Sequence, residues 1–283
     1  MNAPTPLTGL VSQETGDGPG SAVIDQAIAM LKSRAGLVLA AHKRDAVARV
    51  LTERTHQTRR GSPARYLAAL EHDAADPEWA PFVDAFTINH TAFFREHYHF
   101  DILRDFIQGR THPVSVWSCA ASTGEEPYSI AMTLRQACPR AALDQAVWAT
   151  DIDTQAIDRA RAGVYTQERI KPVGMDLLRE FFQRGRGAQA GRVRVKPSLS
   201  AMVQFDTFNL CAPAWNLSRQ FDAIFCRNVM IYFDRATQAR VLERFASRLK
   251  PGGRLFVGHS ENFSHLTRHF HLLGQTVYAL GAK

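Results

Sequence analysis

The chain has 283 residues, of which 45% are hydrophobic, and carries a formal net charge of +7. This length allows a large core and two domains, and the composition is ordinary for a globular protein. No run of eighteen apolar residues exists, and the N-terminus lacks the basic and then apolar layout of a secretory signal, so we expect a cytoplasmic protein without membrane insertion. The four cysteines and eleven histidines are scattered, which predicts neither a disulfide framework nor a metal site.

The N-terminal third of the chain predicts a tail followed by helices. Residues 1–20 are rich in Gly, Pro, Ser and Thr, and we expect them to be disordered. From residue 21 to about 86, apolar residues such as Ile24 and Leu31 recur at helical spacing, which predicts a small all-helical domain. The end of this stretch, 78–86, is predicted to be a connector, and no catalytic motif lies within the domain.

Positive charge is concentrated in this helical domain. Between Lys32 and Arg65 there are nine lysines and arginines but only two acidic residues, a difference that equals the excess of the whole chain. Two interpretations are open. The stretch is either a solvated face that keeps the protein soluble, or a docking face for an acidic partner.

Strand and helix patterns alternate over residues 87–283, which predicts a doubly wound, Rossmann-like α/β domain. One segment departs from the alternation: residues 184–197 alternate apolar and basic side chains after a glycine-rich turn, which predicts an inserted β-hairpin. The strands expected in the main sheet are 114–117, 147–151, 202–205, 221–226, 255–258 and 276–280.

The first two of these strands predict a nucleotide-binding half-fold. Strand 114–117 is followed by a loop of small residues, a helix opened by Pro127, and a second strand that ends in Asp151. A carboxylate in this place suits the two hydroxyl donors of a ribose. Because the loop has one glycine, Gly124, and no G-x-G-x-x-G, we expect an adenosine cofactor without a pyrophosphate, of which S-adenosylmethionine is the common one.

Other polar residues follow predicted strands, and each has an ordinary alternative. Glu126 either caps a helix or binds a cationic or hydroxyl group of the cofactor. Asn209, followed by Leu210, either forms an Asx turn or reads an adenine edge. Arg227 and Asn228 stand at the tip of a buried strand, where an arginine needs a partner. Arg95 is either an exposed arginine with a packed stem or a cation of the site.

Five motifs appear together and in order: Phe93–Glu96, Trp117–Ser129, Ala149–Asp153, Phe225–Phe233, and Leu249–Gly253 followed by Gly258–Phe263. From about Asn89 to the C-terminus, they resemble the CheR family of bacterial chemotaxis receptor methyltransferases. The resemblance implies transfer of a methyl group from S-adenosylmethionine to glutamate side chains of a methyl-accepting chemoreceptor, which yields a glutamate 5-O-methyl ester and S-adenosylhomocysteine.

The resemblance also assigns roles to residues of this chain. Asn89, Thr91 and Arg95 would hold the methionine end of the cofactor and the acceptor. The residues that the motifs place against the cofactor are Asn89, Thr91, Arg95, Glu126, Asp151, Asn209, Leu210, Arg227 and Asn228, with Arg95 and Tyr232 at the methyl-transfer site. A glutamate acceptor is ionised at pH 7 and needs no general base, so the absence of a catalytic triad is expected.

The implied partner is the cytoplasmic domain of the chemoreceptor. In some members of the family the inserted hairpin also binds the receptor's flexible C-terminal tail. Two rival functions fit parts of the sequence. An RNA or small-molecule methyltransferase could use the basic domain to grip RNA, but aromatic residues for base stacking are scarce there, so no nucleic acid is expected. A non-catalytic, receptor-docking adaptor is disfavoured because Arg95, Asp151 and Tyr232 are intact.

Overall fold

The computed structural model describes residues 18–110, 112–139, 143 and 145–281, so the disorder predicted for residues 1–20 falls almost wholly outside the described residues. The chain divides into two compact units, Met1–Ala29 with Ala40–Asp76, and Met30–Leu39 with Pro77–Lys283. The boundary predicted between residues 86 and 87 remains a prediction.

The first unit is helical, as predicted. Its elements are most of α1 (Ser21–Ala35), η1 (Ala41–Lys43), α2 (Arg44–Thr58) and α3 (Pro63–His72). Helix α3 begins where the Ser62 side chain accepts the N–H of Arg65 at 3.3 Å and Pro63 supplies a backbone already suited to a first turn. Buried Leu51 and Leu67 contribute to an apolar core, and their burial is what holds short helices together.

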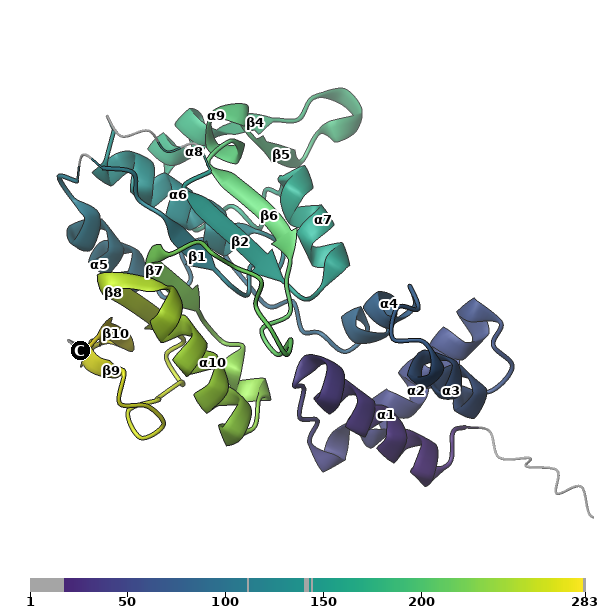
Figure 1. Cartoon of the computed structure of the whole chain (residues 1–283). Coiled ribbons are helices and arrows are strands. Elements are labelled where there is room, and N and C mark those ends of the chain that lie inside the picture. Colours follow the sequence, from purple (N-terminus) through teal and green to yellow (C-terminus); the bar gives the residue numbers. More distant parts are fainter. Residues whose placement is uncertain (1–17, 111, 140–142, 144, 282–283) are drawn as a thin grey trace, which may run out of the picture. The chain divides into compact units, whose positions relative to one another are not determined.

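The second unit is built on a seven-stranded sheet with the order β6-β2-β1-β7-β8-β10-β9 (Figure 1). Neighbours from β6 to β8 pair in parallel, while β10 and β9 are antiparallel at one edge. The strands are β1 (Val116–Ser118), β2 (Val147–Asp151), β6 (Val203–Thr207), β7 (Phe221–Cys226), β8 (Leu249–Val257), β9 (Phe270–Gly274) and β10 (Val277–Leu280).

Helices cover both faces of this sheet (Figure 1). Because side chains alternate along a strand, Val116 packs with α5 and α6 on one face, and Trp117 packs with α10 on the other. This arrangement confirms the predicted doubly wound fold. The helices of this unit are α4 (Trp79–Asp84), α5 (Tyr98–Ile107), α6 (Glu125–Ala137), α7 (Thr154–Ala162), α8 (Met175–Phe181), α9 (Pro197–Ser200) and α10 (Arg235–Arg248), with short turns η2 (Gly187–Gln189) and η3 (Met230–Tyr232).

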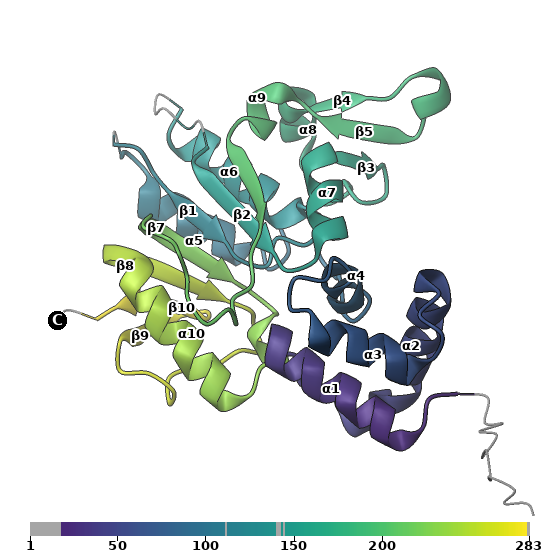
Figure 2. The same cartoon turned by 45° about the vertical axis from the view of Figure 1, so that its right-hand side comes forward.

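An inserted β-subdomain follows α7, as predicted. It consists of β3 (Val164–Thr166), β4 (Phe182–Arg184) and β5 (Arg192–Val195), which form an antiparallel sheet in the order β3-β5-β4 (Figure 2). In β5 the valines are buried and the arginines are exposed, so the alternation of apolar and basic residues matches one packed and one solvated face. Strand β3 has no counterpart among the strands expected from the sequence.

Three local expectations were wrong. Residues 78–86 are not only a connector, because Trp79–Asp84 forms helix α4. The strand expected at 255–258 begins earlier, because α10 ends at Arg248 and β8 runs from Leu249 to Val257. Strand β9 was not expected, since four of its five residues are exposed and leave no alternation to detect. None of the helices within the described residues is long and apolar enough to cross a membrane.

Candidate functional site

The carboxyl ends of three neighbouring strands lie side by side in the second unit. Strand β1 stands between β2 and β7, and Ser118 aligns with Ala149 of β2 and Phe225 of β7. Parallel strands end at the same edge of a sheet, which is where ligands bind in open α/β folds. The loop after Ser118, the side chain of Asp151 and the residues that follow β7 are therefore brought to one place.

The loop between β1 and α6 is fixed by backbone hydrogen bonds and by one glycine. The N–H of Cys119 donates to the carbonyl of Phe225 at 2.9 Å, which ties the loop to β7. Gly124 has a φ of +97°, and a Cβ built there would lie 2.7 Å from the hydroxyl oxygen of Tyr165. Only glycine fits this position, and α6 begins at the next residue.

Asp151 ends strand β2 with both carboxylate oxygens already bound to the backbone. Its Oδ2 accepts the N–H of Ser122 at 2.8 Å, and its Oδ1 accepts the N–H of Asp153 at 3.0 Å. Burial raises the pKa of Asp151 to about 6, against the opposing effect of these hydrogen bonds. Each carboxylate oxygen has two lone pairs, so the group can still accept two hydroxyl donors, as a ribose diol requires.

Glu126 is buried in the first turn of α6. Its Oε1 accepts the hydroxyl of Ser118 at 2.8 Å, and its Oε2 accepts Nη1 of Arg227 at 3.0 Å. Burial raises the pKa of Glu126, while Arg227 and Ser118 act in the opposite direction. The residue therefore does more than cap a helix, because it balances a buried cation that comes from the end of β7.

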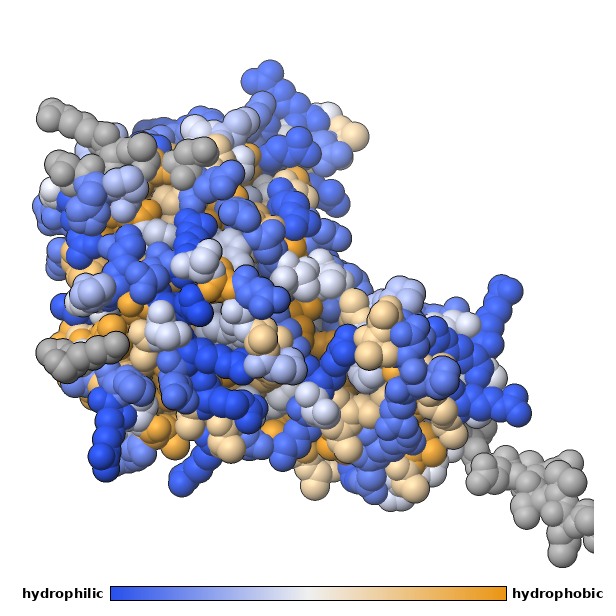
Figure 3. Space-filling view, in the orientation of Figure 1, coloured by the Kyte–Doolittle hydropathy of each residue, from blue (hydrophilic) through white to orange (hydrophobic). Residues whose placement is uncertain are grey.

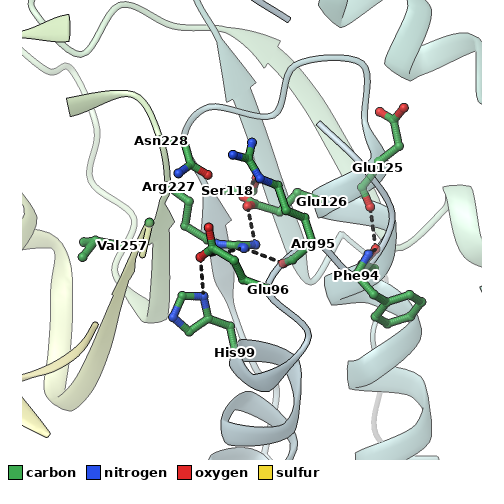
Figure 4. A network of polar contacts seen from close by, with 12 residues as sticks. Phe94, Arg95, Glu96, His99, Ser118, Glu125, Glu126, Arg227, Asn228 and Val257 are labelled. Carbon is green, nitrogen blue, oxygen red and sulfur yellow. Dashed lines mark hydrogen bonds and ion pairs between the residues drawn. The ribbon is translucent and has the colours of Figure 1, made fainter. Parts of the chain in front are cut away.

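Arg227 connects three parts of the site. Its side chain is only 2% exposed and lies between Glu96 and Glu126, with Nη2 at 3.1 Å from Oε2 of Glu96 (Figure 4). The same Nη2 donates to the carbonyl of Arg95 at 2.5 Å. Two carboxylates and a carbonyl thus contact the two Nη groups of the buried guanidinium, which answers the need for a partner that the sequence indicated.

Arg95 differs from Arg227 in its surroundings. It is partly exposed, and its Nη1 donates to the carbonyl of His90 at 2.8 Å. Among the described residues, no carboxylate forms an ion pair with it. A cation with remaining donors beside a buried ionic network suits the binding of an incoming carboxylate.

Asn89 bridges the loop and the β2–α7 turn. Its Nδ2 donates to Oδ2 of Asp153 at 2.6 Å, and its Oδ1 accepts the hydroxyl of Ser122 at 2.9 Å. The backbone of Thr91 accepts Nη1 of Arg169 at 3.0 Å. Hydrogen bonds to Ser122 and Asp153 therefore connect Asn89 with Asp151. Thr91 is linked to an arginine that precedes α8.

Asn209 and Leu210 follow strand β6. The amide of Asn209 is engaged at both ends, since Nδ2 donates to the carbonyl of Arg34 at 2.7 Å and Oδ1 accepts the N–H of Cys211 at 2.8 Å. The second bond is the Asx turn that the sequence allowed as an alternative. Leu210 is 6% exposed and packs in the cluster of Trp117. Contacts of these two residues with an adenine remain a prediction.

Asn228 and Tyr232 lie in the segment after β7. Asn228 has a left-handed backbone with a φ of 58°, and its N–H donates to Oε2 of Glu261 at 2.9 Å. Tyr232 ends η3, and its carbonyl accepts the N–H of Val38 at 2.9 Å. The side chain of Tyr232 is partly buried, so its place beside the reacting atoms remains a prediction.

Sequence reasoning missed two carboxylates at this edge of the sheet. Glu96 binds Arg227 and also lies 3.0 Å from Nδ1 of His259. Glu261 is 3% exposed and accepts the backbone N–H groups of Asn228 and Gly258, the latter at 2.6 Å. Both stand within motifs that were noted, Phe93–Glu96 and Gly258–Phe263, but a single sequence does not reveal their long-range partners.

The donor set fits S-adenosylmethionine. The cofactor offers a ribose diol, a cationic ammonium and sulfonium, and a carboxylate, and this edge provides Asp151 and Glu126 as acceptors and Arg95 as a donor. Within the described residues, Nε of Arg227 is also buried without a hydrogen-bond partner. Buried polar atoms without a hydrogen-bond partner are uncommon in protein cores and are found at sites that bind ligands.

Comparisons with known proteins agree with this chemistry. Residues 89–279 match the CheR methyltransferase SAM-binding domain, and residues 23–87 match the CheR methyltransferase all-alpha domain. The chain is 51% identical to the chemotaxis protein methyltransferase of Klebsiella aerogenes over 251 residues, which covers 89% of this chain and 87% of that relative. It is 49% identical to the protein of the same name from Escherichia coli over 251 residues, 89% of this chain and 88% of the relative.

A more distant relative is the chemotaxis protein methyltransferase 2 of Pseudomonas aeruginosa, which is 45% identical over 247 residues, 86% of this chain and 88% of the relative. The fold, the strand-end carboxylate and the matched SAM-binding domain together define an S-adenosylmethionine-dependent methyltransferase. The chain belongs to the CheR methyltransferase family and serves in chemotaxis.

Proposed function

We propose that this protein is a glutamate O-methyltransferase that modifies the cytoplasmic domain of methyl-accepting chemoreceptors. The observation that carries the proposal is Arg95, a partly exposed guanidinium with no carboxylate partner among the described residues. Its carbonyl accepts Arg227, which pairs with Glu126 in the first turn of α6. A guanidinium with open donors recognises a carboxylate by charge-assisted hydrogen bonds. The acceptor that fits is a glutamate side chain.

The residues of the chain position the acceptor for methyl transfer and supply no acid–base chemistry. When bound, S-adenosylmethionine supplies an electrophilic methyl group. A glutamate carboxylate is ionised at neutral pH and is already a nucleophile, so Arg95 needs only to orient it for an in-line approach. Too tight a clamp would stabilise the ground state and slow the transfer, and a partly hydrated arginine avoids this.

The remaining roles follow from the contacts. Asp151 would accept the ribose hydroxyls, and Glu126 the methionine ammonium region. Asn89 and Thr91 would line the methionine end, and Tyr232 would border the acceptor. The other proposed cofactor contacts are Asn209 and Leu210 at the adenine, and Arg227 and Asn228 at the closure of the cleft.

The β-subdomain has the features of a docking site for the receptor's C-terminal tail. Strand β4 is an edge strand, and an edge can accept an added strand from an extended peptide. A hollow of about 550 Å³ beside it is lined by several arginines, among them Arg186, Arg192 and Arg194. Figure 3 shows mostly hydrophilic side chains over this hairpin. Such a surface would suit an acidic or carboxylate-terminated tail and raise the local enzyme concentration.

Ion pairs compensate the charge of some basic residues in the helical unit. Arg44 is paired with Asp25, and Arg60 with Asp76, so their charges are partly compensated. The exposed basic residues for which the structure shows no ion pair with a described residue include Lys43, Arg49 and Arg59. These three are the better candidates for steering a glutamate-rich receptor helix.

The deciding experiment measures transfer of a labelled methyl group from S-adenosylmethionine to receptor-containing membranes of the source bacterium, with RNA as a parallel substrate. A glutamate ester is expected to form on the receptor and to release methanol in base. Label on RNA, or no label on any acceptor, would contradict the proposal.

Tail docking is tested separately, by calorimetry with a synthetic peptide of the receptor C-terminus. Arg192→Glu and Arg194→Glu are expected to weaken the peptide but not S-adenosylmethionine. Arg159→Glu is the matched control, because it makes the same change of charge at an exposed position of α7. If the wild-type protein binds no tail peptide, the docking role is wrong.

A further inference from the structure

The backbone around Arg95 is held in an unfavourable conformation. Phe94 and Glu96 are not glycines, yet they have φ angles of 53° and 55° and lie on either side of Arg95. A left-handed residue with a side chain costs about 1–2 kcal/mol, so the surroundings must hold this segment in place. Strain on both sides of Arg95, the residue proposed to face the acceptor, indicates that the direction of its side chain matters.

Contacts from two sides fix the segment. On one side, the N–H of Phe94 donates to the hydroxyl of Ser129 in α6 at 3.0 Å. On the other, Arg227 donates to the carbonyl of Arg95 at 2.5 Å. Glu96 completes this second contact, because its Oε2 lies 3.1 Å from the same Nη2 of Arg227 (Figure 4).

Glu96 is not needed to neutralise Arg227. Glu126 already forms an ion pair with Nη1 of that arginine at 3.0 Å, and a second buried carboxylate adds a desolvation cost. Burial alone would raise the pKa of Glu96, but the charge of Arg227 and the bond to His259 outweigh it and lower the pKa to about 2. Glu96 is thus a fully ionised group whose location next to Arg95 calls for another role.

We propose that Glu96 is a positioning residue for methyl transfer, which directs Nη2 of Arg227 onto the carbonyl of Arg95 and thereby holds the Arg95 guanidinium toward the acceptor. His259, whose Nδ1 lies 3.0 Å from Oε1 of Glu96, keeps the carboxylate in this orientation. The proposal rests on the proposed function, in which Arg95 binds the acceptor glutamate.

The test compares Glu96→Gln with the wild type in receptor methylation and in S-adenosylmethionine affinity. Glutamine keeps the size of the side chain but removes the charge that holds Arg227. The expected result is a fall in kcat of about 10- to 100-fold, as for a misplacement of a catalytic group by roughly 1 Å, with cofactor affinity within about threefold of wild type. Glu96→Asp keeps the charge and is expected to recover part of kcat.

Asp222→Asn is the matched control. Asp222 is also a buried carboxylate with two cationic partners, Arg110 and Lys250, but it lies at the amino end of β7. This variant is expected to lose thermal stability while kcat stays near wild type. If Glu96→Gln behaves in the same way, Glu96 is only structural and the proposal is wrong.

Combination with Arg95→Ala separates this inference from the proposed function. If Glu96 acts through Arg95, Glu96→Gln has little further effect on kcat once Arg95 is removed, because coupled residues are not additive. An equal loss in both backgrounds would overturn the positioning role. Wild-type kcat in Arg95→Ala itself would instead refute the role of Arg95 in the proposed function.

Discussion

The two ends of strand β7 both carry buried ionic groups, but they are built in different ways. At the amino end, Asp222 is fully satisfied by Nη1 of Arg110 at 2.9 Å, the N–H of Ser115 at 2.9 Å and Nζ of Lys250 at 2.8 Å. None of these residues has a left-handed backbone. The contacts at this end of the strand therefore serve to stabilise the fold.

The carboxyl end combines ion pairs with strain and with unused donors and acceptors. Phe94, Glu96, Ser122 and Asn228 all have positive φ angles there. Nε of Arg227 is buried without a hydrogen-bond partner among the described residues. Strained backbone and incomplete hydrogen bonding reduce stability, and they persist where a function requires them. Ion pairs alone therefore do not mark the site, whereas ion pairs together with strained backbone do.

The sharpest way to test this difference is to remove Arg95. Arg95→Ala is expected to reduce methyl transfer by about 1,000-fold, or about 4 kcal/mol in the activation free energy, because the acceptor carboxylate loses its cationic partner. Circular dichroism and thermal unfolding should show an intact fold, since the side chain makes one hydrogen bond to the backbone of His90. Turnover near the wild-type value would make Arg95 an ordinary surface residue.

The next effect concerns the cofactor. Asp151→Ala is expected to weaken S-adenosylmethionine binding by roughly 2–4 kcal/mol, because a buried charged acceptor of two hydroxyl groups is lost. Isothermal calorimetry on the folded variant measures this directly. Unchanged affinity would remove Asp151 from the cofactor site and would leave the carboxyl end of β2 without a binding role.

A substitution at the amino end of β7 should change the stability of the fold but not the rate of methyl transfer. Asp222→Asn is expected to lower the free energy of unfolding by about 2 kcal/mol, since Arg110 and Lys250 lose a charged partner but are exposed enough to regain water. Urea unfolding gives the stability and the labelled-methyl assay gives kcat. A large loss of kcat at unchanged stability would erase the contrast between the two ends.

The smallest effect is a dependence on pH. The pKa of Asp151 is raised to about 6 in the fold, so the protonated form is favoured and the native state gives up stability as pH rises through 6. From pH 5 to pH 8, the cofactor-free wild type should lose about 1–1.5 kcal/mol relative to Asp151→Asn, in which this titration is absent. If the difference in free energy of unfolding between the two proteins does not change with pH, Asp151 is ionised in the fold without loss of stability.

The strand ends at which the cofactor is proposed to bind could be predicted from the sequence. The strand 147–151 ends in Asp151, as its apolar run followed by an acid predicted, and β7 has the bounds that were expected. These features are local, because a buried strand must be apolar and the residue after it faces the edge of the sheet. The order of the motifs then indicated the family.

Other features depended on residues that are distant in the sequence. The ion pair of Glu96 with Arg227 joins two segments that only the packing of α5 against the sheet brings together. Likewise, the hydrogen bond from Asn209 to the carbonyl of Arg34 joins the segment after β6 to the end of α1, 175 residues earlier in the chain. No local pattern signals a partner more than a hundred residues away.

The sequence by itself therefore determined the doubly wound fold, the inserted β-subdomain, the cofactor class and the position of Asp151, because hydrophobic periodicity and strand-end chemistry are encoded over a few neighbouring residues. Only the tertiary structure decided which carboxylates hold Arg227, which arginine keeps open donors, and where the backbone is strained. The physical reason is that burial and ion pairing are set by contacts between separate elements, and these contacts exist only once the chain has folded.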